Sequence, residues 1–148
     1  MLLNKLCTTK INYYVKNIPN ADSKVIIKTT GGDEQIYLKA GKVKFTIEGS
    51  EIEALIFEDP EQEQFQYYLL FRDQTTGVET YKNGRMLQIP KKGDTLIIDF
   101  NYAYNPYSSY NDNWDCPITP VENVLPAAIK AGEKSLDNKF IVQGSYLE

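Results

Sequence analysis

Apolar and polar residues alternate along several short stretches of this chain, a pattern typical of β-strands with one buried face. The clearest case is residues 42–48, KVKFTIE, where every second side chain is apolar. Gly49-Ser50 then provides a turn, and residues 51–57 predict the returning strand. That strand carries apolar residues on both faces: Ile52, Ala54 and Ile56 on one, Leu55 and Phe57 on the other.

Further segments of the chain predict strands separated by turn residues. Gly31-Gly32 indicates a hairpin between residues 25–30 and residues 35–39. Asn83-Gly84 is the strongest short hairpin signal in the chain. The continuous apolar centre of residues 94–100 predicts a strand buried on both faces, or nearly so. The segments are 25–30, 35–39, 67–71, 85–89 and 94–100, with less regular candidates at 10–18 and around Phe140, Val142 and Tyr146.

Short strands at regular spacing predict an all-β, antiparallel fold, either a small barrel or a strongly curled sandwich. We expect one domain over residues 1–148. One short helix is predicted near residues 124–131, because Ala127 and Ala128 favour helix and Gly132 suits the position after its end. Pro126 limits that helix to about two turns.

The charge and the apolar runs exclude two classes of partner. Lys and Arg number 16 against 20 Asp and Glu, and the basic residues are scattered, so no nucleic-acid surface is expected. No apolar run approaches the roughly 20 residues of a membrane span. The first residues, MLLNKLC, are too short for a signal peptide. We expect a cytoplasmic protein, although the sequence would not reveal an export signal that lay upstream of it.

Histidine is absent from the sequence. This excludes catalytic serine or cysteine nucleophiles that histidine activates, and it also excludes metal sites with histidine ligands. No metal site is expected, and no cofactor is identified. Cys7 and Cys116 could form a disulfide, but two buried thiols are the preferred interpretation.

Residues 99–134 are rich in tyrosine, proline and asparagine and carry the only tryptophan. An ordered loop of this composition is usually functional or a structural clasp. We expect residues 101–120 to pack across one end of the sheet.

Several motifs of the chain resemble an uncharacterised prokaryotic family, domain of unknown function 1684. They are FRDQTTGVETYKNGRML at 71–87, DFNYAYNP at 99–106, Cys116-Pro117 with Pro120, Glu122-Asn123, and AGEK at 131–134. The resemblance covers about residues 41–134 and implies no known activity, because the family has none assigned. The chain differs from the family pattern at Ser108, where the family has cysteine, so a cysteine pair is not expected to be essential. It also looks like a shortened form, since family members are longer upstream.

The carboxylates within these motifs are candidate acid and base groups, because two of them about 5 to 9 Å apart could support glycosidase-like chemistry. The alternative is that they cap turns and pair with Arg85. Asp99, at the end of an apolar strand, is expected to need a partner, and Arg85 is the obvious candidate. The catalytic candidates are Asp73, Asp99 and Glu133, with Glu122 also inside a motif.

Arg85 could alternatively hold a ligand, in a pocket with aromatic walls and amide donors. Its predicted companions in ligand binding are Tyr81, Asn101, Tyr104, Asn105 and Tyr110. Such a lining suits a sugar, a carboxylate or a flavin phosphate, so a flavin is not excluded. A competing interpretation is that the tyrosines form a clasp that holds the loop to the sheet.

Three hypotheses of function follow. The first is a small-ligand-binding β domain. The second is a histidine-free hydrolase that uses a carboxylate pair with Arg85 as an electrostatic clamp. The third is a structural or interaction module whose motifs form a folding clasp.

Overall fold

The computed structural model describes residues 8–11, 24–61, 66–90, 96–106 and 115–135, and within them antiparallel strands are joined by loops and short 3-10 turns. One sheet has the order β2-β3-β4-β5-β6, and β7 pairs with β1 in a second, smaller sheet. The strands are β1 (Thr8–Ile11), β2 (Lys24–Lys28), β3 (Glu34–Ile47), β4 (Ser50–Glu58), β5 (Gln66–Phe71), β6 (Arg85–Pro90) and β7 (Leu96–Asp99).

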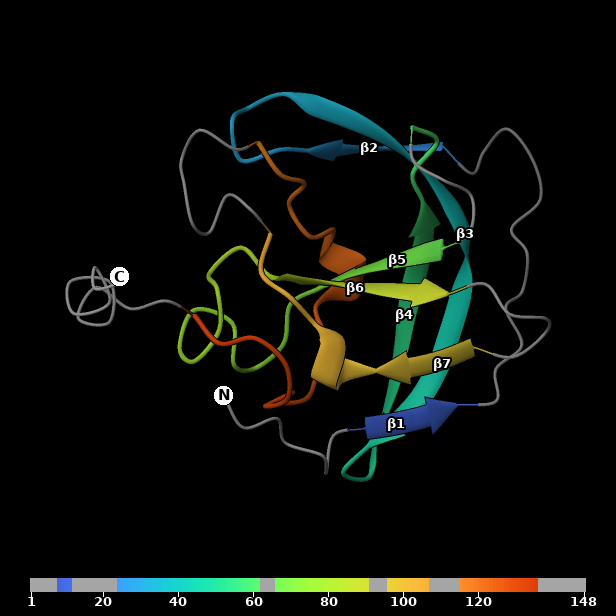
Figure 1. Ribbon diagram of the computed structural model, residues 1–148, viewed down its shortest axis with the longest axis vertical. Coiled ribbons are helices and arrows are strands. Elements are labelled where there is room, and N and C mark those ends of the chain that lie inside the picture. The colour runs from blue at the N-terminus through green and yellow to red at the C-terminus, as the bar shows by residue number, and fades with distance from the viewer. Residues whose placement is uncertain (1–7, 12–23, 62–65, 91–95, 107–114, 136–148) are drawn as a thin grey trace.

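The prediction of an all-β antiparallel fold is confirmed, in its curled rather than its barrel form. In Figure 1, β3 curves along the length of the molecule, and β7 and β1 lie side by side. Hydrogen-bonded pairing does not continue from β6 to β7, so the sheet does not close on itself. No helix in the described residues is long and apolar enough to cross a membrane.

The long strand β3 contains both strands predicted at 35–39 and 42–48. Its pairing with β4 shifts register between Lys39 and Gly41, which explains why the sequence reads as two segments. Beyond the shift, burial alternates strictly, as the pattern of 42–48 predicts. The hairpin predicted around Gly31-Gly32 is also confirmed, since β2 pairs with the beginning of β3.

The two faces of β4 take part in two different hydrophobic cores. Ile52, Ala54 and Ile56 belong to the main core, which also contains Phe71, Phe100 and Ile129. Leu55 and Phe57 belong to a second core on the opposite face. The second core is smaller, comprising Ile27, Tyr37, Leu55, Phe57 and Leu70, with Val25, Tyr68 and Met86 packed against it.

The hairpin predicted at Asn83-Gly84, which would pair residues 78–81 with residues 85–89, is wrong. β6 does pair with a preceding strand, but that strand is β5, with Phe71 opposite Arg85, and residues 72–84 form a long loop between them. The loop folds on itself because the Asp73 side chain accepts hydrogen bonds from the Thr75 backbone N–H and hydroxyl. Local side-chain bonds of this kind compete successfully with strand pairing.

The expectation of burial on both faces is wrong for β7. Leu96 and Ile98 enter the main core, whereas Ile97 is 53% exposed. The strand pairs with β1, with Ile98 opposite Thr9, and its second face lines an open cleft described below. Only one face therefore meets a core.

The short helix predicted near residues 124–131 is also wrong, because the chain there is extended. The only helical residues nearby are a single 3-10 turn, Val121–Asn123. Residues 123–131 alternate between buried and less buried positions, with Leu125, Ala127, Ile129 and Ala131 all in the main core. Backbone hydrogen bonds to the 72–84 loop, such as Leu125 N–H to the Arg72 carbonyl at 2.7 Å, outweigh the local helix propensity.

Two other predictions fall partly outside the described residues. The candidate strand at 10–18 is described only to Ile11, and that around 140–146 not at all. Of the loop 101–120, residues 107–114 lie outside the description. Its two ends do pack on the large sheet, since Tyr104 pairs with β6 and Pro117 forms a bridge to Thr29, just after β2.

Candidate functional site

Tyr104 extends the large sheet by one residue beyond its edge strand β6. Its backbone exchanges two hydrogen bonds with Met86, each 2.9 Å long. Gln88 follows Met86 by two residues in β6. Both Gln88 and Tyr104 line two neighbouring clefts and thus lie at the boundary between them.

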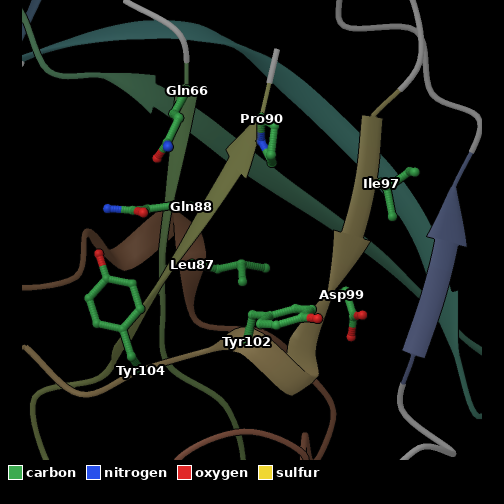
Figure 2. A pocket seen from close by; sticks show the side chains of 8 residues that line it. All are labelled: Gln66, Leu87, Gln88, Pro90, Ile97, Asp99, Tyr102 and Tyr104. Atoms are coloured by element: carbon green, nitrogen blue, oxygen red, sulfur yellow. The ribbon is translucent and has the colours of Figure 1, made fainter. Parts of the chain in front are cut away.

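The first cleft, here the seam cleft, lies between β6 and β7, which do not pair with each other, and has a volume of about 640 Å³. Figure 2 shows Leu87, Gln88 and Pro90 of β6 along one side, with Ile97 and Asp99 of β7 along the other and the Tyr102 ring between the two strands. Gln66 and Tyr104 complete its lining. Most of this surface is apolar, and among the described residues that line it Asp99 is the only charged one.

The second cleft, here the tyrosine cleft, has a volume of about 510 Å³ and lies over the second core. Three tyrosines from three separate parts of the chain line it, namely Tyr37 of β3, Tyr68 of β5 and Tyr104. Asp59 and Glu133 supply two carboxylates. The remaining lining residues are Met86, Gln88, Asn105, Pro106 and Cys116.

The AGEK motif holds the Tyr104–Asn105 segment in place beside this cleft. The Glu133 N–H donates to the Ala103 carbonyl, and the Glu133 carboxylate accepts the Asn105 N–H, both at 2.9 Å. Gly132 has a φ of +84°, and a Cβ there would lie 2.7 Å from the Phe100 carbonyl oxygen. Only glycine permits this close approach, so the motif is tied to the position of the cleft wall.

Asn105, which lines the tyrosine cleft, carries a buried acceptor. The residue is only 3% exposed, and its side-chain Nδ2 donates to the Lys134 carbonyl at 2.9 Å. Since a carbonyl can only accept, this bond fixes which end of the amide is nitrogen. The other end, Oδ1, is buried and receives no hydrogen bond from any of the described residues.

The phenol of Tyr37 lies in a desolvated and electronegative part of the same cleft. The side chain is buried at 4% exposure, and its hydroxyl donates to the Gln35 side-chain oxygen at 3.3 Å. Burial, followed by the negative charge of Asp59, raises the pKa of Tyr37 well above the usual phenol range, with smaller contributions from Tyr104, Tyr68 and Cys116. These groups therefore lie close enough to act on one another electrostatically.

Arg85 and Asp73 form a buried ion pair in the interior, away from both clefts. Arg85 is 1% exposed, and its Nη2 lies 3.1 Å from Asp73 Oδ2. The same guanidinium donates to the carbonyls of Ile129 and Ala131, while Asp73 Oδ2 accepts the Ile129 N–H at 3.0 Å. The pair thus ties the segment 129–131 to β6 and to the 72–84 loop.

The expectation that Arg85 is the partner of Asp99 is therefore wrong. Asp99 instead caps the 3-10 turn Phe100–Tyr102, and its Oδ1 accepts the backbone N–H and the side-chain N–H of Asn101, each at 3.0 Å. As the last residue of β7 and the cap of this turn, Asp99 has its carboxylate satisfied locally, without a distant cation. Asp99 also lines the seam cleft.

The structure brings together only some of the residues predicted to form a site. Tyr104, Asn105 and Glu133 meet in the tyrosine cleft. Tyr81 and Asn101 line neither cleft, and the Tyr81 hydroxyl accepts from the Asn83 side chain at 3.2 Å. Tyr110 lies outside the described residues, as does Cys7, whereas Cys116 is a buried thiol of the cleft wall.

Sequence reasoning missed the part of the tyrosine cleft that the large sheet contributes, above all Tyr37, Asp59 and Tyr68. One signal could have found Tyr68: it is two positions from Leu70, so strand alternation places both on the face opposite Leu69. The apolar residues on both faces of β4 indicate that a second core lies on the same face as Tyr68 and Leu70. Which loop covers it depends on contacts between residues far apart in the sequence.

Within the described residues, no group of three or more Asp, Glu or Cys side chains is placed to hold a metal ion. The site's chemical groups are therefore phenols, two carboxylates, two side-chain amides and a thiol. These groups offer hydrogen bonds, aromatic faces and negative charge.

Comparisons with known proteins concern the fold and the family of the chain. It is similar to the uncharacterized protein from gene locus rrnAC0354 of Haloarcula marismortui, whose solution NMR structure matches with a TM-score of 0.57. The two are 27% identical, over 83% of this chain and 75% of the other. No curated protein matches the chain. The family model described as "Protein of unknown function (DUF1684)" matches residues 9–134, and the chain belongs to that family.

Proposed function

We propose that this protein binds a small organic ligand in the tyrosine cleft. The observation that carries the proposal is the Oδ1 atom of Asn105, a buried acceptor that no described residue satisfies, in a residue that lines a cleft of about 510 Å³. Buried polar atoms nearly always have a partner, and leaving one without costs about 1–3 kcal/mol. A ligand that donates a hydrogen bond there would recover that cost.

The size and lining of the cleft support the same proposal. Ligand sites are typically concave, about 300–1,000 Å³ in volume, with aromatic walls and a few fixed polar groups. The Asn105 segment is held rigidly, by its backbone bond to Glu133 and its side-chain bond to Lys134. A preorganised polar group of this kind fixes the orientation of a ligand at little entropic cost.

A screen of thermal stability against a library of small polar and charged compounds tests the proposal, because a ligand of the native state raises the unfolding temperature. Gln88→Trp would fill the mouth of the cleft from an exposed position of β6. The matched control is Thr46→Trp, at an exposed position of β3 that lines neither cleft. We expect hits for the wild type and Thr46→Trp that disappear in Gln88→Trp. Hits that persist in Gln88→Trp, or no hits at all, would overturn the proposal.

A second candidate function is hydrolysis by a carboxylate pair, favoured because Asp59 and Glu133 line the same cleft. The Glu133 carboxylate accepts the Asn105 N–H, which fixes its position beside the cleft, and there it would act as a base or charge stabiliser. Arg85 would take no direct part, since its donors are engaged in the interior. Turnover of chromogenic glycosides or esters that falls about 100-fold in Glu133→Gln would support this function, and no turnover would exclude it for those substrates.

A further inference from the structure

The aromatic rings of the tyrosine cleft come from three elements that the fold brings together. Tyr37 lies in β3, Tyr68 lies in β5 opposite Phe57 of β4, and Tyr104 is bridged to β6. The Tyr37 ring is fixed by an edge-on contact with Phe57, with ring centroids 6.3 Å apart. Tyrosine faces carry negative potential, and several of them around one space attract a cation.

The charge of the cleft has the same sign as its aromatic faces. Asp59 and Glu133 are its charged lining residues, and neither lysine nor arginine lines it among the described residues. The Asp59 carboxylate is held in place by the Glu61 backbone N–H at 2.9 Å. Its negative charge acts on Tyr37, whose pKa it raises together with burial. An anion in this cleft would therefore meet repulsion, whereas a cation would be stabilised.

The unsatisfied buried acceptor of Asn105, a residue that lines the cleft, adds a directional requirement. Asn105 Oδ1 can only accept a hydrogen bond, so its complement must carry a donor. The Met86 and Pro106 side chains provide apolar surface in the same lining. A complementary ligand thus combines positive charge, an N–H donor and an apolar portion.

We propose that the tyrosine cleft binds an organic ammonium ion, with its N–H donating to Asn105 Oδ1, its charge compensated by Asp59 and Glu133, and its alkyl portion against the tyrosine rings. This inference rests on the proposed function and specifies its ligand class. It also narrows the ligands considered from sequence, because a carboxylate or a flavin phosphate would place negative charge beside two carboxylates.

Three probes that differ only in their head group test the charge preference, namely hexylamine, hexanol and hexanoate. Each is titrated at neutral pH into the ¹⁵N-labelled full chain, and the backbone amide signals of Asn105, Gln88 and Glu133 are followed. We expect hexylamine, which is protonated at this pH, to bind about tenfold more tightly than hexanol and to weaken as salt is added. Hexanoate is expected to leave these signals unchanged.

Variants then assign the preference to the cleft. Asp59→Asn is expected to reduce the difference between hexylamine and hexanol at least severalfold, while leaving hexanol binding unchanged. Its matched control is Glu58→Gln, which removes the same charge from the adjacent residue outside the cleft lining. At the aromatic wall, Tyr68→Phe keeps a ring face and should retain binding of hexylamine, whereas Tyr68→Leu should lose it.

The outcomes separate this inference from the proposed function. Equal binding of hexylamine and hexanol at the cleft overturns the cation preference but leaves ligand binding standing. Loss of the preference in Glu58→Gln as well as Asp59→Asn overturns the assignment to the cleft. If hexylamine leaves the cleft signals unchanged while other library compounds bind there, the ammonium class is wrong, and if no compound binds there, both proposals fail.

Discussion

Arg85 shows how a residue that looks functional in the sequence can be fully engaged in the interior. Its guanidinium contacts the Asp73 carboxylate and the carbonyls of Ile129 and Ala131, and it lies over the Phe71 ring at 5.1 Å from the centroid. Both terminal nitrogens of the group therefore have partners from other stretches of the chain. For this residue the structure favours the clasp interpretation.

We expect Arg85→Met to destabilise the protein by about 3–5 kcal/mol, because it leaves the Asp73 carboxylate buried without its cation. Urea unfolding of Arg85→Met, Asp73→Asn and the double variant measures the effect. The double variant should recover part of the loss, since neither charge then remains alone in the interior. A loss below about 1 kcal/mol for Arg85→Met would contradict a structural role.

Asn123, like Arg85, is a buried polar residue whose side chain is hydrogen-bonded in the interior. It lies in the large sheet where β4 and β5 separate. The two strands share only the pair Phe57 with Tyr68. Asn123, completely buried, accepts the Leu55 N–H and donates to the carbonyls of Leu55 and Leu70, each at 2.8 Å. One side chain thus replaces backbone hydrogen bonds that a regular strand pair would make.

At the scale of elements, the β2–β3 hairpin is held from outside by the segment that contains Cys116. The Thr30 N–H donates to the Cys116 carbonyl at 2.9 Å, and the Ile118 N–H donates to the Lys28 carbonyl at 2.8 Å. Asp115 accepts the Gly31 N–H at 2.6 Å. The turn and the Cys-Pro motif therefore stabilise each other.

The hydrogen bond from the Gly31 N–H to Asp115 predicts a specific dependence of stability on pH. Hydrogen bonds from Thr29 and Gly31 lower the pKa of Asp115 below its ordinary value of 3.8. The carboxylate thus stabilises the folded state above the unfolded pKa, and this contribution is lost as the pH falls through the lower folded pKa. In an NMR titration, the Gly31 amide proton should shift with a midpoint below 3.8.

Asp115→Asn provides the corresponding variant. Its stability should fall below that of the wild type at neutral pH, and the difference should shrink once the wild-type carboxylate is protonated. A Gly31 titration with its midpoint at or above 3.8 would show that these hydrogen bonds do not favour the ionised form of Asp115.

The elements that sequence reasoning predicted correctly are those governed by local alternation and glycine turns, such as residues 42–48 and the β2–β3 hairpin. It failed over 124–131, where alanines favour helix but hydrogen bonds to the 72–84 loop impose an extended chain. The same limit applies to the site. Tyr104, Asn105 and Glu133 were found because they lie in motifs, whereas Tyr37 and Asp59 reach the cleft only through the pairing of strands.

At the scale of the whole molecule, the segment 121–133 contacts the large sheet, the main core and the candidate site. It bridges β4 and β5 through Asn123, covers the main core through residues 125–131, and supports the tyrosine cleft through Glu133. The main core and the candidate site therefore depend on the same stretch of chain. Stability and ligand binding are expected to be coupled through it.

We accordingly expect a chain ended after Pro120 to lose cooperative unfolding, because it exposes the main core and leaves the Arg85–Asp73 pair without the Ile129 and Ala131 backbone. A chain ended after Ser135 keeps every contact named above and serves as the control. Circular dichroism during heating and near-ultraviolet spectra distinguish the two. A cooperative transition in the shorter chain would show that residues 121–133 are dispensable for the fold.

The bridge made by Asn123 also has a consequence for the order in which the protein assembles. Its hydrogen bonds join residues 68 and 53 positions apart, so β4 and β5 can complete their junction only after most of the chain is available. Contacts over such separations slow folding, because the entropy of closing the loop is lost before the contact forms. During synthesis all five strands of the large sheet would emerge with that junction incomplete, and it would be completed only when Asn123 docks against β4 and β5.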